Sequence, residues 1–243
     1  MAHLSKIGLL TVTHDPKGKN IKLLDELHKE FEEIYGELFI TISDESSDDL
    51  VNKFESTQFK VKLIPKKGAA EARREVVNFG LSGTSEYYHY CDFDRLLTWG
   101  KNYLEELKSL NTIIPNHDYL ILGRTERAFS THPRAWIDTE KITNTICSLE
   151  LNKEVDITAG SCSFSRECAK YINKYSKDKM TDSEWAMIIH RIAKLGVDYR
   201  AAEGLEYQVE TNGVNTIVSN AEEWFGRLRL SNIISESALK TGK

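Results

Sequence analysis

Two patterns of apolar and polar positions alternate along the first hundred residues. Short apolar or β-branched segments predict buried strands over residues 6–14, 37–47, 59–65 and 86–93. Apolar residues at helical spacing predict helices over residues 21–36, 48–56 and 66–83. Strands that alternate with helices are typical of a parallel sheet covered on both faces. The expected fold class is therefore α/β, with three α/β/α layers around a mostly parallel sheet.

The second half of the chain is less regular. Its apolar spacing predicts helices over residues 98–114, 133–150, 167–176 and 181–196. Strands are expected over residues 118–129, over 154–166, where the strand runs into a glycine-containing turn, and once or twice within 197–210. We expect one domain over residues 1–220, followed by a C-terminal helix or tail over residues 221–243.

Polar side chains follow each of the first four expected strands. In parallel sheets of this kind, ligands bind outside the carboxyl ends of the strands, which meet at one edge. We therefore expect a ligand site built from Thr13, His14 and Asp15, from Ser43, Asp44 and Glu45, from Lys66 and Lys67, and from Asp92 and Asp94.

Asp92 and Asp94 end the strand that contains Tyr87–Cys91. In extended backbone, residues i and i+2 project to the same side, so the two carboxylates can face one cation. Oxygen ligands of this kind suit Mg²⁺ or Mn²⁺ held together with substrate phosphates. The alternative is a solvated polar turn.

The helix expected after the third strand brings further charge to the same edge. Lys66 and Lys67 precede its N-terminus, where the helix dipole favours anions. Arg73 or Arg74 can reach a phosphate or the two aspartates. Asp44 either accepts a hydrogen bond from a nucleobase or a ribose hydroxyl, or it caps the helix that follows it.

The segment TDSEW (181–185) starts an amphipathic helix and carries two carboxylates. Asp182 lies on the same side as the apolar residues, so it is a candidate for the general base that deprotonates a hydroxyl. Thr181 and Glu184 match the S/T-x-x-E capping box, which gives Glu184 a structural alternative to a catalytic role.

Composition and missing motifs exclude several classes of function. The net charge of −5 argues against a nucleic-acid-binding surface. The segment HDPKGKN (14–20) lacks the spacing of a P-loop, and no G-x-G-x-x-G follows the first strand, which disfavours Walker-type ATPases and Rossmann dehydrogenases. The four cysteines form no C-x-x-C pair, and no segment has the apolar length of a transmembrane helix. We expect a soluble, cytoplasmic protein.

The segment IPKKGAAEARREVVNFGLSGTSEYYHYCDFDR (64–95) resembles the central block of GT-A glycosyltransferases. The matching positions are Gly68, Ala72 with Arg73, Gly80, Tyr88, and Asp92-Phe93-Asp94, while Arg74 stands where the family usually has Asn. The likeness continues more faintly. Thr13 and Asp44 occupy the nucleotide-contacting strand ends, residues 156–168 are similar to the acceptor-side strand and turn, and residues 181–196 are similar to the acidic motif and its helix.

The resemblance implies a non-processive hexosyltransferase with a GT-A-like fold, similar to family 2 of the nucleotide-diphospho-sugar transferases. It implies a UDP- or GDP-sugar donor bound by Thr13, His14, Asp44, Lys67, Arg73 and Asp92. It further implies Mn²⁺ or Mg²⁺ on Asp92 and Asp94, and an unknown acceptor such as a saccharide or a lipid-linked saccharide. Asp182 or Glu184 would be the base of an inverting reaction, and a retaining reaction needs none.

Two other functions remain open. A sugar nucleotidyltransferase has a related sheet, but VTHDPKGKNIK (12–22) lacks the G-x-G-x-R loop that such enzymes usually carry. A protein of the same fold can also bind sugar nucleotides without catalysis.

Overall fold

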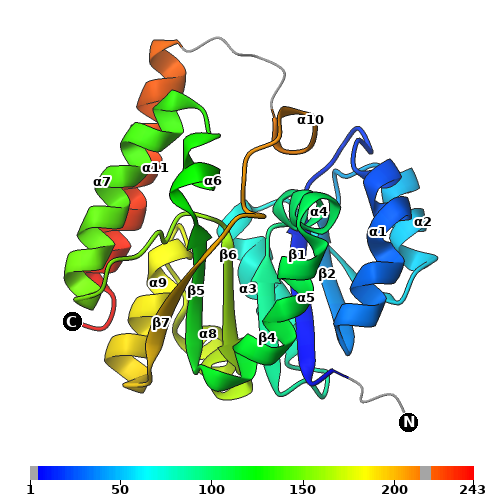
Figure 1. Cartoon of the computed structure of the whole chain (residues 1–243), viewed down its shortest axis with the longest axis horizontal. Coiled ribbons are helices and arrows are strands. Elements are labelled where there is room, and N and C mark those ends of the chain that lie inside the picture. The colour runs from blue at the N-terminus through cyan, green and yellow to red at the C-terminus, as the bar shows by residue number, and fades with distance from the viewer. Residues whose placement is uncertain (1–4, 214–219) are drawn as a thin grey trace.

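A computed structural model of the chain describes residues 5–213 and 220–243 (Figure 1). Its described strands form one seven-stranded sheet in the order β3-β2-β1-β4-β6-β5-β7. The strands are β1 (Ile7–Thr13), β2 (Glu37–Ser43), β3 (Phe59–Ile64), β4 (Tyr87–Cys91), β5 (Tyr119–Arg124), β6 (Ser161–Ser165) and β7 (Val197–Ala202). Neighbouring strands are parallel except at β6, which runs antiparallel to β4 and β5. The expected mostly parallel sheet is confirmed.

Helices cover both faces of the sheet. One face is covered by α1 (Ile21–Ile34), α2 (Asp48–Glu55), α4 (Phe93–Asn102) and α5 (Leu104–Ile113). The other is covered by α3 (Ala69–Gly80), α8 (Arg166–Tyr175), α9 (Asp182–Met187) and the π-helix η2 (Ile188–Ala193). The expected three-layer α/β/α architecture is confirmed.

The remaining helices lie mainly around the β5–β7 end of the sheet. They are η1 (Ile114–Asn116), α6 (Glu126–Ser130), α7 (Arg134–Leu151), α10 (Val209–Asn212) and α11 (Ala221–Lys240). The two long helices α7 and α11 lie side by side at one edge of the molecule, and α1 and α2 lie at the other (Figure 1). No described helix is long and apolar enough to cross a membrane.

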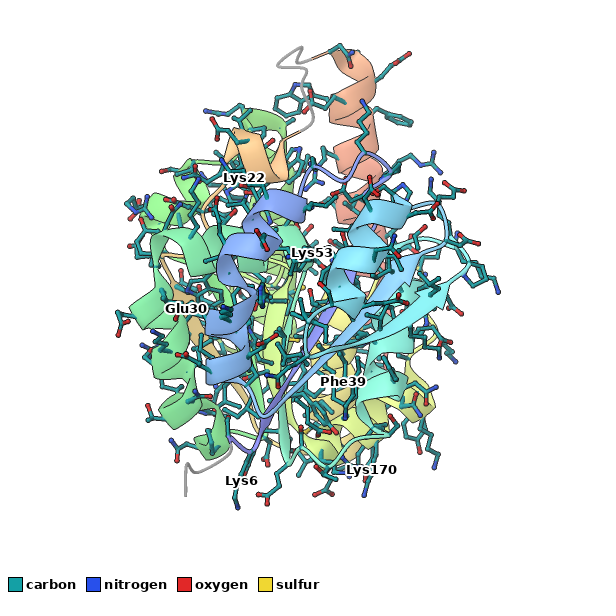
Figure 2. The ribbon with its side chains drawn as sticks, turned by 90° about the vertical axis from the view of Figure 1, so that its right-hand side faces the viewer. Lys6, Lys22, Glu30, Phe39, Lys53 and Lys170 are labelled. Atoms are coloured by element: carbon teal, nitrogen blue, oxygen red, sulfur yellow. The ribbon has the colours of Figure 1, made fainter. Side chains whose placement is uncertain are left out.

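The alternation of side chains along the strands produces two hydrophobic cores. Leu9 and Ile40 point to the core beneath α1 and α4, whereas Leu10 and Phe39 point to the core beneath α3 and α8. The central strands β1 and β2 are thus buried on both faces, as expected for parallel strands. On the outer surface, Lys53 of α2 forms an ion pair with Asp25 of α1 where the two helices lie together (Figure 2).

The end of β4 differs from expectation. The strand stops at Cys91, and Asp92 is the N-cap residue of α4, which begins at Phe93, earlier than predicted. Side chains at i, i+3 and i+4 from Phe93 are buried, so helical periodicity already starts there. The single helix expected over 98–114 is in fact α4 and α5, which meet at Tyr103.

Three other boundaries also differ. Within 154–166 only β6 is a strand, and Gly160 precedes it, so the turn comes before the strand. The strand expected over 118–129 ends at Arg124 because Thr125 caps α6. The helix expected over 181–196 is α-helical in its first part and a π-helix in its second.

Candidate functional site

A cavity of about 430 Å³ opens at the carboxyl ends of β1 to β4, and we call it the strand-end cavity. Eight of the residues predicted from the sequence line it, namely Thr13, His14, Ser43, Lys66, Lys67, Arg73, Asp92 and Asp94. The convergence of these strand ends, expected from parallel topology, is therefore present.

A second cavity of about 230 Å³ lies between α4, α7 and α11, and we call it the helix-side cavity. It shares Arg73, Asp92 and Asp94 with the strand-end cavity. Its other walls include Glu140 of α7 and Arg227 of α11, neither of which was predicted from the sequence. The three shared residues thus form the boundary between the two cavities.

Arg73 is the buried centre of this boundary. Its Nη2 lies 2.7 Å from Asp92 Oδ2, and its Nη1 lies 2.9 Å from Asp182 Oδ2. Nη1 also donates a hydrogen bond to Thr181 Oγ1 at 3.2 Å. Burial disfavours the charge of the guanidinium, but Asp182 and Asp92 outweigh it and hold the pKa of Arg73 well above its ordinary value.

Asp92 is held in position from three directions. Arg73 contacts one carboxylate oxygen closely, and the hydroxyl of Tyr90 donates a hydrogen bond to the other. The carbonyl of Gly160 accepts a hydrogen bond from the backbone N–H of Asp92 at 3.0 Å. Gly160 has a φ of +73°, and a Cβ there would lie 2.7 Å from Asp92 Oδ2. A glycine is thus required where the loop approaches this carboxylate.

Asp94 lies in the first turn of α4, not in extended backbone, so the predicted reason for its pairing with Asp92 was wrong. Both side chains nevertheless line the same two cavities. Asn212 Nδ2 donates a hydrogen bond to Asp94 Oδ2 at 3.0 Å.

The carboxylates fit a divalent cation only as part of a shared site. Among the described residues no cluster of three or more His, Cys, Asp or Glu side chains could hold a metal ion. Mg²⁺ and Mn²⁺ are often held by one or two carboxylates together with substrate phosphates, which Asp94 and Asp92 can provide. Asp94 is the more available ligand, because Arg73 and Tyr90 engage both oxygens of Asp92.

Asp44 does not line either cavity. Its side chain is exposed and accepts a hydrogen bond from the backbone N–H of Lys66 at 3.0 Å. The helix-capping role expected as the alternative is wrong, because Ser47 caps α2 by accepting from the N–H of Leu50. Asp44 therefore joins the ends of β2 and β3 beside the cavity.

The two candidate bases differ in position. Asp182 lines the helix-side cavity. Glu184 lies outside both cavities, fully buried, and accepts hydrogen bonds from the backbone N–H groups of Lys177 and Asp178 at 2.6 and 2.8 Å. The capping box predicted with Thr181 is absent, since no side chain caps α9 there. Through these hydrogen bonds Glu184 anchors the loop that precedes α9.

The sequence matches no protein-family model and no curated protein. Solved structures share its fold. Glucosyl-3-phosphoglycerate synthase from Mycobacterium tuberculosis, in complex with Mn²⁺, UDP-glucose and glycerol 3-phosphate, is 12% identical with a TM-score of 0.58, over 98% of this chain and 81% of that one. Mannosyl-3-phosphoglycerate synthase from Rubrobacter xylanophilus is 13% identical with a TM-score of 0.57, over 95% of this chain and 72% of that one.

An enzyme of another class shares the fold as well. The 4-diphosphocytidyl-2C-methyl-D-erythritol synthase from Anaerococcus prevotii is 11% identical with a TM-score of 0.50, over 93% of this chain and 98% of that one. At such identities these likenesses concern the fold. The expected GT-A-like fold is thereby confirmed.

Proposed function

We propose that the protein is a glycosyltransferase that moves a sugar from a nucleotide-diphosphate sugar to an acceptor hydroxyl. The observation that carries the proposal is the pair of cavities that meet at Arg73, Asp92 and Asp94. Group transfer needs a donor and an acceptor held side by side in fixed orientation. Two adjoining cavities with charged groups at their boundary provide this arrangement.

The strand-end cavity suits the nucleotide-diphosphate donor. Its volume of about 430 Å³ lies within the usual range for small-molecule sites. Lys67 and Gly68 line it just before the N-terminus of α3, where backbone N–H groups and the helix dipole favour phosphate. Gly68 has a φ of +100°, a conformation that residues with a side chain rarely adopt.

A divalent cation would be held by Asp94, with Asp92 beside it, and by the donor phosphates. Such a cation, when bound, neutralises charge on the diphosphate leaving group. The glucosyl-3-phosphoglycerate synthase structure that contains Mn²⁺ and UDP-glucose supports this part of the proposal.

Asp182 is the carboxylate best positioned to receive the acceptor proton in an inverting reaction. The acceptor oxygen would attack the anomeric carbon, the bond to the diphosphate would break, and the hydroxyl proton would pass to Asp182. A retaining reaction requires no such base. The anomeric configuration of the product relative to the donor, measured by NMR, distinguishes the two reactions, and a retained configuration would remove this role from Asp182.

The alternative activity is that of a sugar nucleotidyltransferase, which the fold shared with the Anaerococcus enzyme keeps open. The loop between β1 and α1 lacks the G-x-G-x-R pattern expected of that class, so we favour glycosyl transfer. Pyrophosphate release from a nucleoside triphosphate and a sugar 1-phosphate would identify the alternative.

The test compares nucleotide sugars by thermal shift and calorimetry in the presence of Mn²⁺. We expect a UDP- or GDP-sugar to stabilise the protein, by about 2.7 kcal/mol at a concentration a hundred times Kd. Asp94→Asn should weaken metal-dependent binding at least tenfold, because a charged ligand is lost. Asp49→Asn, an exposed aspartate on α2, is the control and should bind normally.

The proposal fails if no nucleotide sugar binds, or if Asp94→Asn binds donor and metal as the wild type does. Hydrolysis or transfer of a labelled sugar then separates an enzyme from a non-catalytic binding protein. If the donor binds but its sugar is neither hydrolysed nor transferred to any type of acceptor, the protein is a non-catalytic binding protein.

A further inference from the structure

Arg95, in the wall of the helix-side cavity, is a cation that has no ionic partner among the described residues. It lies in the first turn of α4, directly after Asp94. Across residues 5–213 and 220–243, nothing forms an ion pair or hydrogen bond with its guanidinium, and its Nη1 is buried without a partner. Its guanidinium carbon lies 5.8 Å from the centre of the Trp136 ring and 5.7 Å from that of Tyr207.

Arg227 of α11 provides a second cationic group in the same cavity. Its guanidinium carbon lies 4.0 Å from the centre of the Trp136 ring, so both arginines lie against one indole. One end of Arg227 pairs with Glu140, but its buried Nε has no partner among the described residues. Burial lowers the pKa of Arg227, which reflects incomplete compensation of its charge.

The carboxylates that line this cavity are already paired. Arg73 binds Asp92 and Asp182, and Arg124 lies 2.8 Å from Glu140, which also pairs with Arg227. Asp94 accepts a hydrogen bond from Asn212. Buried donors of a charged group are costly to leave unsatisfied, so Arg95 Nη1 and Arg227 Nε are suited to an acceptor that a ligand supplies.

We propose that Arg95 and Arg227 bind an anionic group, a phosphate or a carboxylate, on the acceptor that receives the sugar. This inference rests on the proposed function and narrows the acceptor to an anionic molecule. The guanidinium fork matches the geometry of phosphate and carboxylate oxygens. The cavity of about 230 Å³ is smaller than the usual site for a drug-sized molecule, so the group it encloses is small.

The test is calorimetric titration of inorganic phosphate and of glycerol phosphate into protein saturated with UDP and Mg²⁺. The nucleotide fills the strand-end cavity, so that added phosphate reports on the helix-side cavity. We expect one anion site, and we expect Arg95→Gln to weaken it at least tenfold while UDP affinity stays within twofold. Glycerol, which is neutral, should not bind.

Two further variants test whether the anion binds to the guanidinium groups of the helix-side cavity. Arg227→Lys keeps a positive charge toward Glu140 but loses the fork, and it should also weaken the anion. Arg134→Gln changes an exposed arginine of α7 that pairs with Asp138, and it should bind as the wild type does. Circular dichroism and thermal melting show that each variant is folded.

The outcomes separate this inference from the proposed function. If UDP binds but no anion does, or if Arg95→Gln and Arg227→Lys bind anions normally, the anion site is overturned while the donor site stands. If neither UDP nor GDP nor any nucleotide sugar binds, the proposed function fails, and the same titration without nucleotide still tests the arginines.

Sedimentation with vesicles distinguishes a lipid headgroup from a free anion as the source of the charge. Vesicles containing phosphatidic acid that bind the wild type but not Arg95→Gln would support the anion site and assign it to a lipid. Binding of glycerol phosphate without vesicle binding would support it and assign it to a soluble acceptor.

Discussion

At the scale of single residues, the guanidinium of Arg73 joins three parts of the chain. It extends from α3 to Asp92 at the end of β4 and to Asp182 at the start of α9. The Arg73 side chain is only 8% exposed, and that of Asp182 is 7% exposed. Removing one member of a buried ion pair leaves uncompensated charge, which costs far more than the loss of a surface pair.

We expect Arg73→Gln to lower the free energy of unfolding by about 3–5 kcal/mol, because Asp92 and Asp182 lose their cation together. Urea denaturation at neutral pH measures this change. Arg134→Gln, which breaks an exposed pair with Asp138, should cost less than about 1 kcal/mol. Similar losses in the two variants would contradict the central role given to Arg73.

Other residues of the site could not be inferred from the sequence. The importance of Gly160 lies in its approach to Asp92, and Arg227 reaches the site only because α11 packs on α7. Both contacts join positions far apart in the chain, and local periodicity carries no information about them. Arg95 could have been predicted as a site residue, since it directly follows Asp94 in the sequence.

At the scale of elements, β4 is the strand where the sheet changes direction, with parallel β1 on one side and antiparallel β6 on the other. His89 of β4 is fully buried between the Tyr35 hydroxyl, 2.7 Å from its Nδ1, and Ser161 Oγ, 3.1 Å from its Nε2. Burial lowers the pKa of His89 to about 3. The imidazole is therefore neutral in the native state.

This histidine makes the fold sensitive to acid. The unfolded chain takes up a proton on His89 below its ordinary pKa of 6.5, whereas the native state does so only near pH 3. Stability contributed by the neutral ring is complete above pH 6.5 and is lost as the pH falls toward 3. Between pH 6.5 and 4.5 this loss should be about 2–3 kcal/mol.

The measurement compares urea unfolding of the wild type and His89→Gln at these two pH values. Glutamine can replace the hydrogen bonds but does not titrate. We expect the wild type to lose about 2 kcal/mol more than the variant between them. Equal losses would mean that another group controls the acid sensitivity. His132, whose pKa burial lowers to about 2, should contribute in the same direction in both proteins.

The elements themselves were largely predictable, for a physical reason. The strands β1 and β2 are mainly apolar and β-branched segments, and in β3 apolar residues alternate with lysines, so the pattern of each indicates a strand. The start of α4 was missed because apolar residues continue past Asp92 to Phe93, and this pattern does not reveal where extended backbone gives way to helix. The position of that boundary determines whether Asp94 lies in extended backbone or in the first turn of α4.

At the scale of the whole molecule, the two cavities adjoin but depend on different elements. The strand-end cavity lies at the carboxyl ends of β1 to β4, and the helix-side cavity depends on α7 and α11. The helix α11 is fixed to the rest by buried hydrogen bonds. Ser231 Oγ lies 2.7 Å from Thr143 Oγ1, and Ser183 Oγ donates to the carbonyl of Ile234 at 2.6 Å.

This packing bears on the division expected at residue 220, in which the last residues form a separate helix or tail. A separate tail would unfold locally without disturbing the sheet. A helix that closes a cavity should instead unfold together with α7. The buried residues of α11 lie in its second half, from Ser231 to Ala238, while Phe225 and Leu228 in its first half are exposed. The two halves should therefore differ in protection.

Amide hydrogen exchange measured by mass spectrometry tests this prediction. Peptides covering residues 231–238 should exchange as slowly as those of α7, with an opening free energy close to that of global unfolding, and residues 221–226 should exchange sooner.

Ser183→Ala, which removes the bond to Ile234, should lower protection of the second half of α11 by about 1 kcal/mol more than it lowers that of α1. Fast exchange along all of α11, with α7 still protected, would instead establish residues 221–243 as a separable tail. The helix-side cavity would then lack a fixed wall, and Arg227 could not be held in place beside Arg95.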